Sequence, residues 1–373
     1  MENKILLPQK RMAFRDSMMT FDSSGFTMDA QGNQIGKKLD HRYATRDGRF
    51  VDSTGAFLVG ELERLDQTLN DPLVSVTWGR DIDLREDVTI ADEVSSFTLS
   101  TYGSASGLGG GQGIGNGKAW IGKNTDQITG VGLDIAKIPH LLNPWAMELK
   151  YTILELESAA KLGRPIDQQK YEGLQLKHQM DIDEMVYIGD TVLAQTGLIN
   201  NSLVTNVNNI APGVSSLTTW ANKTPDEILA DVNAALTSVW GASAWAVIPD
   251  RILIPPTQFG LISTMKVSQA GNVSVLKYIT ENNILSTSGM GKLTILPLKW
   301  AVGAGVGGTI GTVGTVDRMV VYTKDKKRVR YPMTMLQRTP IQFQSIYHMT
   351  TYFCRLGQVE CVYPETIGYF DGL

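Results

Sequence analysis

The spacing of hydrophobic and polar positions changes sharply once along the chain, and this change marks its clearest predicted elements. Over residues 145–151 apolar and mostly polar residues alternate, which predicts a strand with one face against a core. Residues 153–160 favour a short helix that Gly163 closes, and Pro165 prevents that helix from continuing. A second, longer helix is predicted over residues 167–188.

The longer helix is predicted to be amphipathic, with Asp167 as its N-cap. Apolar residues recur along it at spacings of three and four. The main stripe comprises Tyr171, Leu174, His178, Ile182 and Met185, and a second stripe comprises Leu176, Met180 and Tyr187. At about 1.5 Å per residue the helix would be roughly 33 Å long, which is enough to brace a whole domain.

Two alternating stretches with a glycine-rich segment between them predict a long hairpin. Residues 94–102 and residues 131–135 each alternate between apolar and polar positions, as strands with one buried face do. Residues 103–118 are rich in glycine, which suits a flexible tip.

Residues 190–330 are predicted to form a second lobe, with mixed helices around a small sheet. The best-defined signal in this lobe is Thr224-Pro225-Asp226-Glu227, a capping box with proline at the first helical position. The helix that it starts runs toward Trp240. Strands are predicted at residues 246–248, 251–254 and 293–298, and further helices from residues 256 and 275.

Three other segments complete the prediction. Residues 58–70 indicate a short helix that ends before Pro72, and the following Val74, Val76 and Trp78 alternate as a strand. Residues 342–373 form extended segments with aromatic anchors, and they must pair with a sheet that already exists.

Residues 1–57 are polar, punctuated by glycine and mildly basic, and no apolar period persists in them. Such a segment cannot build its own core, so it is either an extended arm ordered by neighbours or a disordered tail. The aromatic residues favour the arm, because a solvated tail would lack such anchors. These residues are Phe14, Phe21, Phe26, Tyr43 and Phe50.

The order strand, short helix, Gly-Arg-Pro, long amphipathic helix, Gly-Asp resembles the major capsid proteins of tailed bacteriophages, which have the Hong Kong 97-type fold. The resemblance rests on residues 155–190, from the short helix through the long helix to Gly-Asp, and the flanking segments agree with it. It implies an α+β fold with an N-terminal arm, an E-loop hairpin, a peripheral domain and an axial domain. The implied boundaries are residues 1–57 for the arm, 58–94, 136–190 and 336–373 for the peripheral domain with its spine helix at 167–188, 95–135 for the E-loop, and 191–335 for the axial domain.

The resemblance also implies a function. The subunit would assemble with itself as hexamers and pentamers into an icosahedral shell around a phage double-stranded DNA genome, in the host bacterial cytoplasm. Portal, scaffold or decoration proteins would be further partners, DNA would be held without sequence specificity, and no membrane would be involved. Two alternatives stay open: an encapsulin-type bacterial shell protein, which shares the fold, and an enzyme that binds a phosphate ligand at a glycine-rich loop.

Composition narrows these choices. The chain has 373 residues, enough for two or three lobes, and no run of about 18 apolar residues that could span a membrane. The apolar run near the N-terminus is too short for a secretory signal. Charged residues make up 19% of the chain, below the usual ~25%, which suggests that much of the surface meets partners. The net charge of −4 argues against tight nucleic-acid binding.

Two glycine-rich stretches are candidate phosphate sites, because backbone N–H groups in such loops can cradle phosphates. In the first, Gln112 stands where a Walker loop needs glycine, and Ala119 replaces the hydroxyl that reaches magnesium. The second, residues 303–308, fits the dinucleotide pattern, but no helix is predicted after it to receive the pyrophosphate. Both stretches are therefore interpreted as loops, and no cofactor is expected.

Other candidate chemistry is sparse. His178 with Asp181, Asp183 and Glu184 could chelate a cation, but His178 also falls in the apolar stripe. Cys354 and Cys361 are predicted to be buried or strand thiols without a disulfide. An isopeptide bond from Lys118 or Lys123 would need a catalytic acid that the sequence does not reveal. We therefore expect no enzymatic activity.

A basic run over residues 324–330 could meet an acidic neighbour or DNA, or it could be a solvated turn. The residues expected to serve assembly are Gly103, Gly107, Gly111, Gly117 and Lys118 at the E-loop tip, and Lys326, Lys327, Arg328 and Arg330 in the basic run.

Overall fold

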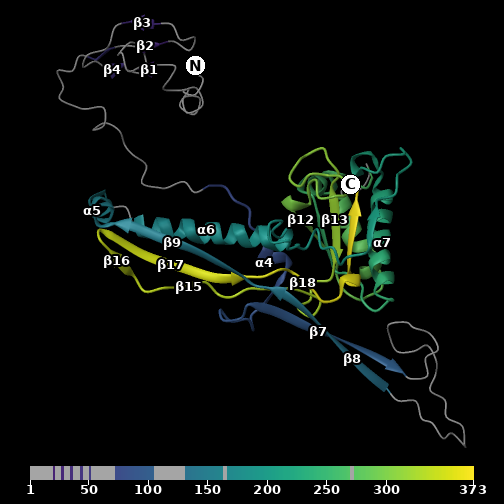
Figure 1. Ribbon diagram of the computed structural model, residues 1–373. Helices are drawn as coiled ribbons and strands as arrows, with labels where there is room; N and C mark the ends of the chain where they lie inside the picture. The colour runs from purple at the N-terminus through teal and green to yellow at the C-terminus, as the bar shows by residue number, and fades with distance from the viewer. Residues whose placement is uncertain are drawn as a thin grey trace, which may run out of the picture. The chain divides into compact units, whose positions relative to one another are not determined.

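The computed structural model describes residues 72–104, 131–162, 166–268 and 273–373, and the backbone of short strands within residues 1–71 (Figure 1). The chain divides into two compact units, Met1–Pro72 and Leu73–Leu373. In the first unit, β1 (Thr20–Phe21), β2 (Thr27–Met28) and β3 (Gln34–Gly36) form one antiparallel sheet, and β4 (Tyr43–Ala44) pairs with β5 (Phe50–Val51). The helix predicted over residues 58–70 lies outside the described residues.

The predicted change from strand to helix is confirmed. β9 spans Asn143–Thr152, α5 spans Ile153–Leu162 and α6 spans Ile166–Tyr187. After α6 the chain turns at Gly189, which adopts φ +80° and donates its N–H to the carbonyl oxygen of Glu184 at 3.1 Å. A side chain cannot fit at this position, because a Cβ on Gly189 would lie 2.3 Å from the carbonyl oxygen of Gln195.

The long helix α6 buries one face. Its buried side chains are Leu174, His178, Ile182, Asp183, Val186 and Tyr187. The predicted main stripe is confirmed at its centre, where His178 contacts Trp145 of β9. The predicted second stripe is wrong at Met180, which is exposed. The reason is that the strands cover this part of the helix from one side, as the contact between Tyr171 and Tyr352 also shows.

A four-stranded sheet supports α6. It contains β15 (Gln337–Arg338), β16 (Gln342–Gln344), β17 (Tyr347–Leu356) and β9. The long strand β17 runs antiparallel to β9 over its whole length, from the pair Tyr347 and Thr152 to the pair Leu356 and Asn143. The prediction that a late segment of the chain returns to this sheet is therefore confirmed for β17.

The predicted hairpin is also confirmed. β7 (Val94–Ser104) and β8 (Val131–Leu141) pair antiparallel, from Val94 and Leu141 to Ser104 and Val131. The paired strands continue to residue 141, beyond the predicted limit of 135. The glycine-rich tip after residue 104 lies outside the described residues.

The second predicted lobe is built around a five-stranded sheet in the order β10-β19-β13-β11-β12. Its strands are β10 (Val207–Asn209), β11 (Arg251–Ile254), β12 (Thr294–Pro297), β13 (Arg318–Tyr322) and β19 (Ile367–Asp371). Its helices are α7 (Pro225–Ala242), α8 (Pro256–Thr264), α9 (Val275–Asn282) and α10 (Ile284–Thr287). Residues of α7, α8 and α9 share one core with one face of this sheet, and the end of α6 shares a second core with the other face. The predicted capping box at Thr224 is present and starts α7.

The assignment of all of residues 336–373 to the sheet beside α6 is wrong for the last strand. β19 lies between β10 and β13 in the five-stranded sheet, parallel to the first and antiparallel to the second. Both faces of β19 are buried, because Tyr369 packs into one core and Phe370 into the other. A strand with two apolar faces requires a sheet that is covered on both faces, as this one is.

Two predicted strands are absent. Residues 73–77 form no strand; they lead into α4 (Trp78–Asp81), because the backbone N–H groups of Thr77 and Trp78 donate to Asp183 and to no neighbouring strand. Residues 246–248 form part of the turn after α7, where Ala244 and Trp245 adopt φ +53° and +64°. The remaining described elements are β6 (Asp83–Arg85), β14 (Val329–Pro332), β18 (Glu360–Cys361), and the 3₁₀ turns η2 (Trp220–Asn222), η3 (Lys299–Ala301) and η4 (Pro364–Thr366).

Candidate functional site

The side chains that were candidates for metal binding are buried or contact other groups of the chain. His178 faces Cys354 at 3.3 Å between Nε2 and Sγ, and Asp183 accepts hydrogen bonds from backbone N–H groups. Both cysteines are buried and free, and burial raises the pKa of each thiol to about 12. Across the described residues, no group of three or more histidine, cysteine, aspartate or glutamate side chains could hold a metal ion.

The dinucleotide-like stretch at residues 303–308 is a loop of turns. The N–H of Gly303 donates to Asp317 at 2.9 Å, and the N–H of Val306 donates to Asp371 at 2.9 Å. These N–H groups are therefore occupied by carboxylates of the chain itself. Glycine is required at residue 303 by packing, because a Cβ there would lie 2.1 Å from the carbonyl oxygen of Thr309.

The hairpin carries an exposed row of large apolar side chains, which we call the hairpin row. It comprises Val94 of β7 and Leu133, Ile135 and Leu141 of β8. Leu133 is 56% exposed, Ile135 60% and Leu141 64%. Because side chains alternate along a strand, the opposite face of the hairpin carries the buried Phe97, which stacks on His140. The hairpin is a two-stranded sheet, so its outer edges pair with no other described strand.

A buried carboxylate anchors the base of this hairpin. Glu360 is fully buried and accepts hydrogen bonds from the hydroxyl of Ser95, from Arg85 at 3.1 Å and from Arg330 at 2.6 Å. Arg85 also donates to the carbonyl oxygen of Ser96 at 3.0 Å. Its hydrogen bond with Asp87 raises the pKa of Arg85, which keeps this side chain a cation. Four charged or polar side chains thus fix the position of β7 where it leaves the body of the subunit.

The basic run lies in the connection between β13 and β14 and in the first two residues of β14. Lys324 pairs with Asp83 at 3.4 Å, and Arg328 pairs with Asp325 at 2.6 Å. Arg330 pairs with Glu360 at 2.6 Å and so belongs to the group of side chains that anchors the hairpin. Lys326 and Lys327 are exposed, and neither has an ion pair within the part of the chain that the structure describes. The run therefore offers two free cations.

A groove with a volume of 1040 Å³ lies between the base of the hairpin and the turn after α7. Its walls include Phe97 and Thr98 of β7, Ala244 of the turn, and Tyr363. Lys327, Arg328 and Arg330 of the basic run also line it, which brings together three of the predicted assembly residues. Gly103 lies near the end of β7, whereas Gly107, Gly111, Gly117 and Lys118 lie outside the described residues.

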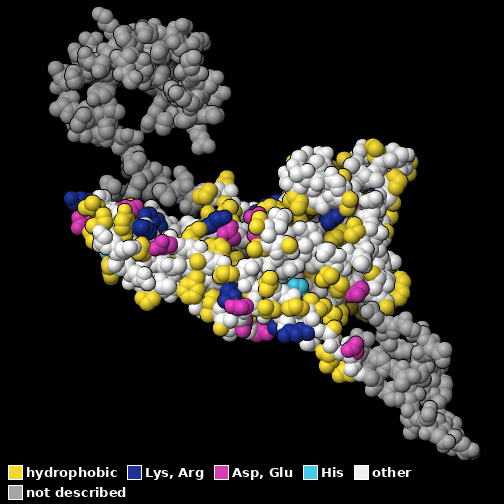
Figure 2. Space-filling model, viewed as in Figure 1, with side chains coloured by type: hydrophobic (Ala, Val, Ile, Leu, Met, Phe, Trp, Pro, Cys, Tyr) yellow, Lys and Arg dark blue, Asp and Glu magenta, His cyan; other side chains and the backbone are white. Residues whose placement is uncertain are grey.

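A second apolar surface, which we call the end patch, lies where α5 follows β9. It comprises Ile153 and Leu154 of α5, Phe343 of β16, and Ile346 of the following turn, all exposed. The N–H of Ile153 donates to the carbonyl oxygen of Ile346 at 3.1 Å, which holds the two segments together. Figure 2 shows hydrophobic side chains at the end of the second unit that carries α5.

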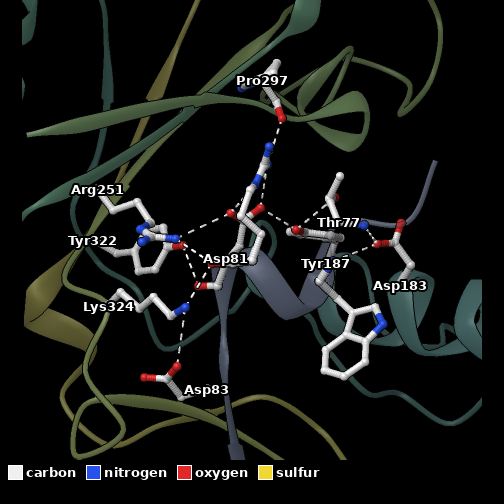
Figure 3. Close-up of polar contacts among 11 residues, drawn as sticks. Thr77, Asp81, Asp83, Asp183, Tyr187, Arg251, Pro297, Tyr322 and Lys324 are labelled. Atoms are coloured by element: carbon white, nitrogen blue, oxygen red, sulfur yellow. Dashed lines mark hydrogen bonds and ion pairs between the residues drawn. The ribbon is translucent and has the colours of Figure 1, made fainter.

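A network of buried polar side chains, which we call the joint, lies between α4, the end of α6 and the five-stranded sheet (Figure 3). Its first centre is Asp81, which is fully buried and accepts two hydrogen bonds from Arg80 at 2.8 Å. The hydroxyl of Tyr187 on α6 donates to the same carboxylate, and Arg251 on β11 lies 3.6 Å away. The hydroxyl of Tyr322 on β13 donates to the backbone carbonyl of Asp81 at 2.7 Å.

The second centre of the joint is Asp183 on α6, also fully buried. It accepts from the backbone N–H of Thr77 at 2.8 Å and of Trp78 at 3.1 Å. Trp300 donates its indole N–H at 2.7 Å, and the ammonium of Lys299 lies 3.1 Å away. Burial and the nearby Asp81 raise the pKa of Tyr187, so its hydroxyl remains a donor between the two centres.

No motif in the sequence predicts the hairpin anchor or the joint. Their members lie far apart in the chain, as in the contacts of Ser95 with Glu360 and of Thr77 with Asp183. One local signal was present: Asp183 directly follows the most deeply buried position of the predicted apolar stripe, Ile182. A carboxylate next to a buried stripe needs a partner of its own.

No helix among the described residues is long and apolar enough to cross a membrane. A family model described as Major capsid protein matches residues 117–373, which is more than half of the chain. No curated protein matches.

Several solved structures are similar in fold. One is the capsid of Myoviridae phage XM1, with a TM-score of 0.66, 15% identity, and coverage of 86% of this chain and 100% of that chain. A chain from Microbacterium phage Oxtober96 has a TM-score of 0.54, 9% identity, and coverage of 86% and 97%. A chain from Mycobacterium phage Adephagia has a TM-score of 0.52, 10% identity, and coverage of 83% and 94%. At such identities these likenesses establish a shared fold.

Proposed function

This chain belongs to the major capsid protein family, and from that premise we propose that its copies assemble as hexamers and pentamers into the icosahedral shell of a phage. The observation that carries the proposal is the family match over residues 117–373, and the Hong Kong 97-type fold agrees with it. The encapsulin-type shell and the phosphate-binding enzyme gain no support from these findings. In this proposal the shell encloses double-stranded DNA and assembles in the host cytoplasm.

The domains follow from this assignment. The peripheral domain comprises the predicted residues 58–94 and 136–190, with α6 as the spine helix, and the part of residues 336–373 that includes β15, β16 and β17. The hairpin of β7 and β8 is the E-loop. The axial domain comprises residues 191–335 together with β19, because this strand completes its five-stranded sheet. Residues 1–57 are the N-terminal arm, which docks on neighbouring subunits.

The hairpin row is the first surface that contacts another copy. Removal of apolar surface from water contributes roughly 25 cal/mol per Å², and monomeric proteins rarely leave large apolar patches uncovered. The row extends along a hairpin whose base is fixed by Glu360, so it is presented in a defined direction. A neighbouring copy that covers Leu133, Ile135 and Leu141 gains this energy at little cost in flexibility.

The end patch is the second such surface. Its apolar side chains come from three segments, two of which a backbone hydrogen bond holds together, and Glu155 of α5 forms an ion pair with Lys170. A patch that is apolar and locally neutral suits contact with an equivalent patch on another copy. The hairpin row and the end patch lie on different elements, so one subunit can contact more than one neighbour.

The predicted assembly residues have separate roles in this proposal. Gly103, Gly107, Gly111, Gly117 and Lys118 belong to a tip that adjusts the hairpin to neighbours at different angles. Lys326 and Lys327 are free to meet an acidic neighbour or the packaged DNA, whereas Arg328 and Arg330 act through the ion pairs that shape the groove. Portal, scaffold or decoration proteins are further partners of the assembled shell.

Electron microscopy of the purified full-length protein tests the proposal. We expect rings and closed shells, with interfaces well above about 2,000 Å² per subunit in total. A protein that remains monomeric at tens of micromolar, with a melting temperature raised by nucleotide, would refute it in favour of the enzyme alternative.

A further inference from the structure

The joint of Figure 3 connects three parts of the second unit that are distant in sequence. Asp81 belongs to α4, Tyr187 and Asp183 to the end of α6, and Arg251 and Tyr322 to the five-stranded sheet. Arg80 extends the connection, since it donates to the carbonyl oxygen of Pro297 on β12 at 2.9 Å. Every described polar contact of the two carboxylates therefore joins different elements, apart from the pair with the adjacent Arg80.

Two kinds of contact hold the spine helix to the five-stranded sheet. The first is apolar: Ile182 and Val186 share a core cluster with Leu253 and Val320. Apolar contacts are non-directional, so they permit small rotations of one packed element against another. The second is the joint, whose hydrogen bonds depend on both distance and angle.

The joint contributes more to the relative orientation of α6 and the five-stranded sheet than to the stability of the subunit. A buried ion pair gains little net stability, because desolvation of both charges offsets their attraction. What a satisfied buried network provides is a unique geometry, since any rotation leaves a buried charge without its partner. The Asp81 carboxylate is satisfied in this way: it accepts hydrogen bonds from Arg80 and Tyr187, and the cation of Arg251 lies 3.6 Å away.

We propose that Asp81 is a positioning residue that fixes the angle between the spine helix α6 and the five-stranded sheet, and that this angle sets the curvature of the shell. The link between this angle and shell curvature rests on the proposed function. The role of Asp81 in fixing the angle concerns the subunit alone. Small changes in the angle between two rigid parts of a subunit are repeated in every copy, so they alter the radius at which a shell closes.

The first test measures the angle directly. Spin labels placed on exposed helical positions by the substitutions Glu172→Cys in α6 and Lys277→Cys in α9 report the distance between the two parts. Cys354 and Cys361 are buried thiols whose pKa is raised to about 12, so they resist labelling. Dilution of labelled chains with unlabelled full-length protein limits the pulsed electron paramagnetic resonance signal to distances within one chain.

We expect one narrow distance distribution in the parent and a broadened or shifted one in Asp81→Asn. Tyr187→Phe is the second variant: it keeps the buried ring and removes only the hydroxyl that bonds to Asp81, so it folds even where Asp81→Asn does not. The matched control is Asp92→Asn, which removes an exposed carboxylate that accepts hydrogen bonds from Thr89. A distribution in Tyr187→Phe identical to that of the parent and of the control would overturn the inference.

The second test measures shells by electron microscopy. The parent and Asp92→Asn should give one predominant diameter, whereas Asp81→Asn and Tyr187→Phe should give several diameters or open sheets. Shells of unchanged diameter from a variant with a changed distance distribution would refute the link to curvature. Failure of the parent itself to form shells would refute the proposed function, and the distance measurement would still decide the role of Asp81.

Discussion

The five-stranded sheet and the β7–β8 hairpin use similar apolar residues for opposite purposes. Every residue of β13 and of β19 is buried, because helices α7, α8 and α9 share a core with one face of that sheet and the end of α6 shares a core with the other. In the hairpin, Leu133, Ile135 and Leu141 are mostly exposed, and no third described strand joins it. The sheet is completed by its own chain, whereas in the proposed assembly a second chain covers the hairpin row.

This difference separates folding from assembly within one subunit. The buried sheet and the spine helix supply the apolar contacts that make the subunit fold. The hairpin, by contrast, has a firm attachment at Glu360 and an apolar face without cover. Substitutions in the first region should therefore act on stability, and substitutions in the second should act on assembly alone.

The largest effect is expected for Ile182→Asp, on the face of α6 that packs against both the sheet and the joint. Ile182 is fully buried, so the variant places an unpaired carboxylate in the core. We expect a loss of roughly 3–5 kcal/mol in the free energy of unfolding, enough to unfold the subunit before assembly. Urea denaturation followed by circular dichroism measures it.

The control for this substitution is Met180→Asp on the exposed side of the same helix, which should change stability by no more than about 0.5 kcal/mol. Equal stabilities of Ile182→Asp and the parent would mean that α6 is oriented differently from the structure described above.

A matched pair of truncations compares the two regions directly. Ile254→Ala in β11 opens a cavity in a fully buried site and should cost about 2–5 kcal/mol. Ile135→Ala in β8 removes the same atoms from an exposed site and should leave the stability of the unassembled subunit within about 0.5 kcal/mol of the parent. Chemical denaturation of both variants, kept dilute enough to prevent assembly, measures the contrast. A comparable loss in both would show that the hairpin row is already covered within the subunit.

Much of this contrast could be predicted from the sequence. The period change near residue 152, the capping box at Thr224 and the alternating arms of the hairpin are local patterns, and each was confirmed in the structure. Local patterns report on the nearest four or five residues, and that range covers caps, turns and amphipathic faces.

The failures share one physical cause, which is partners distant in sequence. Residues 74–78 alternate like a strand. However, the backbone N–H groups of Thr77 and Trp78 donate to the carboxylate of Asp183, whereas in a strand they would donate to a neighbouring strand. The last strand, β19, was assigned to the wrong sheet because its alternation does not say which sheet it joins. The hairpin anchor and the joint depend on contacts such as Arg85 with Glu360, which no local pattern reports.

A smaller effect is expected at the start of α7. Thr224 accepts a hydrogen bond from the N–H of Glu227, and Glu227 in turn accepts from the N–H of Thr224 at 2.7 Å. Thr224→Ala removes one half of this reciprocal cap and should cost about 1 kcal/mol. The control Thr264→Ala removes a hydroxyl that bonds only to helix carbonyls, and it should be nearly neutral. Thermal melting of the two variants checks the difference, and equal melting temperatures would contradict the role of the cap.

The smallest effect is a dependence of stability on pH. Burial lowers the pKa of His178 below its ordinary 6.5, partly opposed by Asp181. As the pH falls through 6.5 the unfolded chain binds a proton at this residue and the folded chain does not. Protons therefore favour unfolding: the contribution is fully present above that pH, decreases below it, and becomes constant below the folded pKa.

His178→Gln should accordingly lose less stability than the parent between pH 7 and pH 5, roughly the range in which an ordinary histidine titrates. Gln175→Asn, a substitution without a titratable group on the exposed side of α6, should retain the slope of the parent. Urea denaturation at several pH values measures the slopes. A slope in His178→Gln equal to that of the parent would show that His178 does not contribute to the pH dependence of stability.

Sedimentation of a hairpin variant tests whether the hairpin row binds a neighbouring copy in the shell. The double variant Leu133→Ser and Ile135→Ser removes two members of the hairpin row, and Val214→Ser with Val306→Ser removes a similar exposed apolar surface elsewhere. We predict that the hairpin variant melts like the parent and sediments as subunits or loose capsomers, whereas the control variant sediments as full-sized shells. Full-sized shells from the hairpin variant, in the same yield as from the parent, would show that the hairpin row is not required for contact between copies.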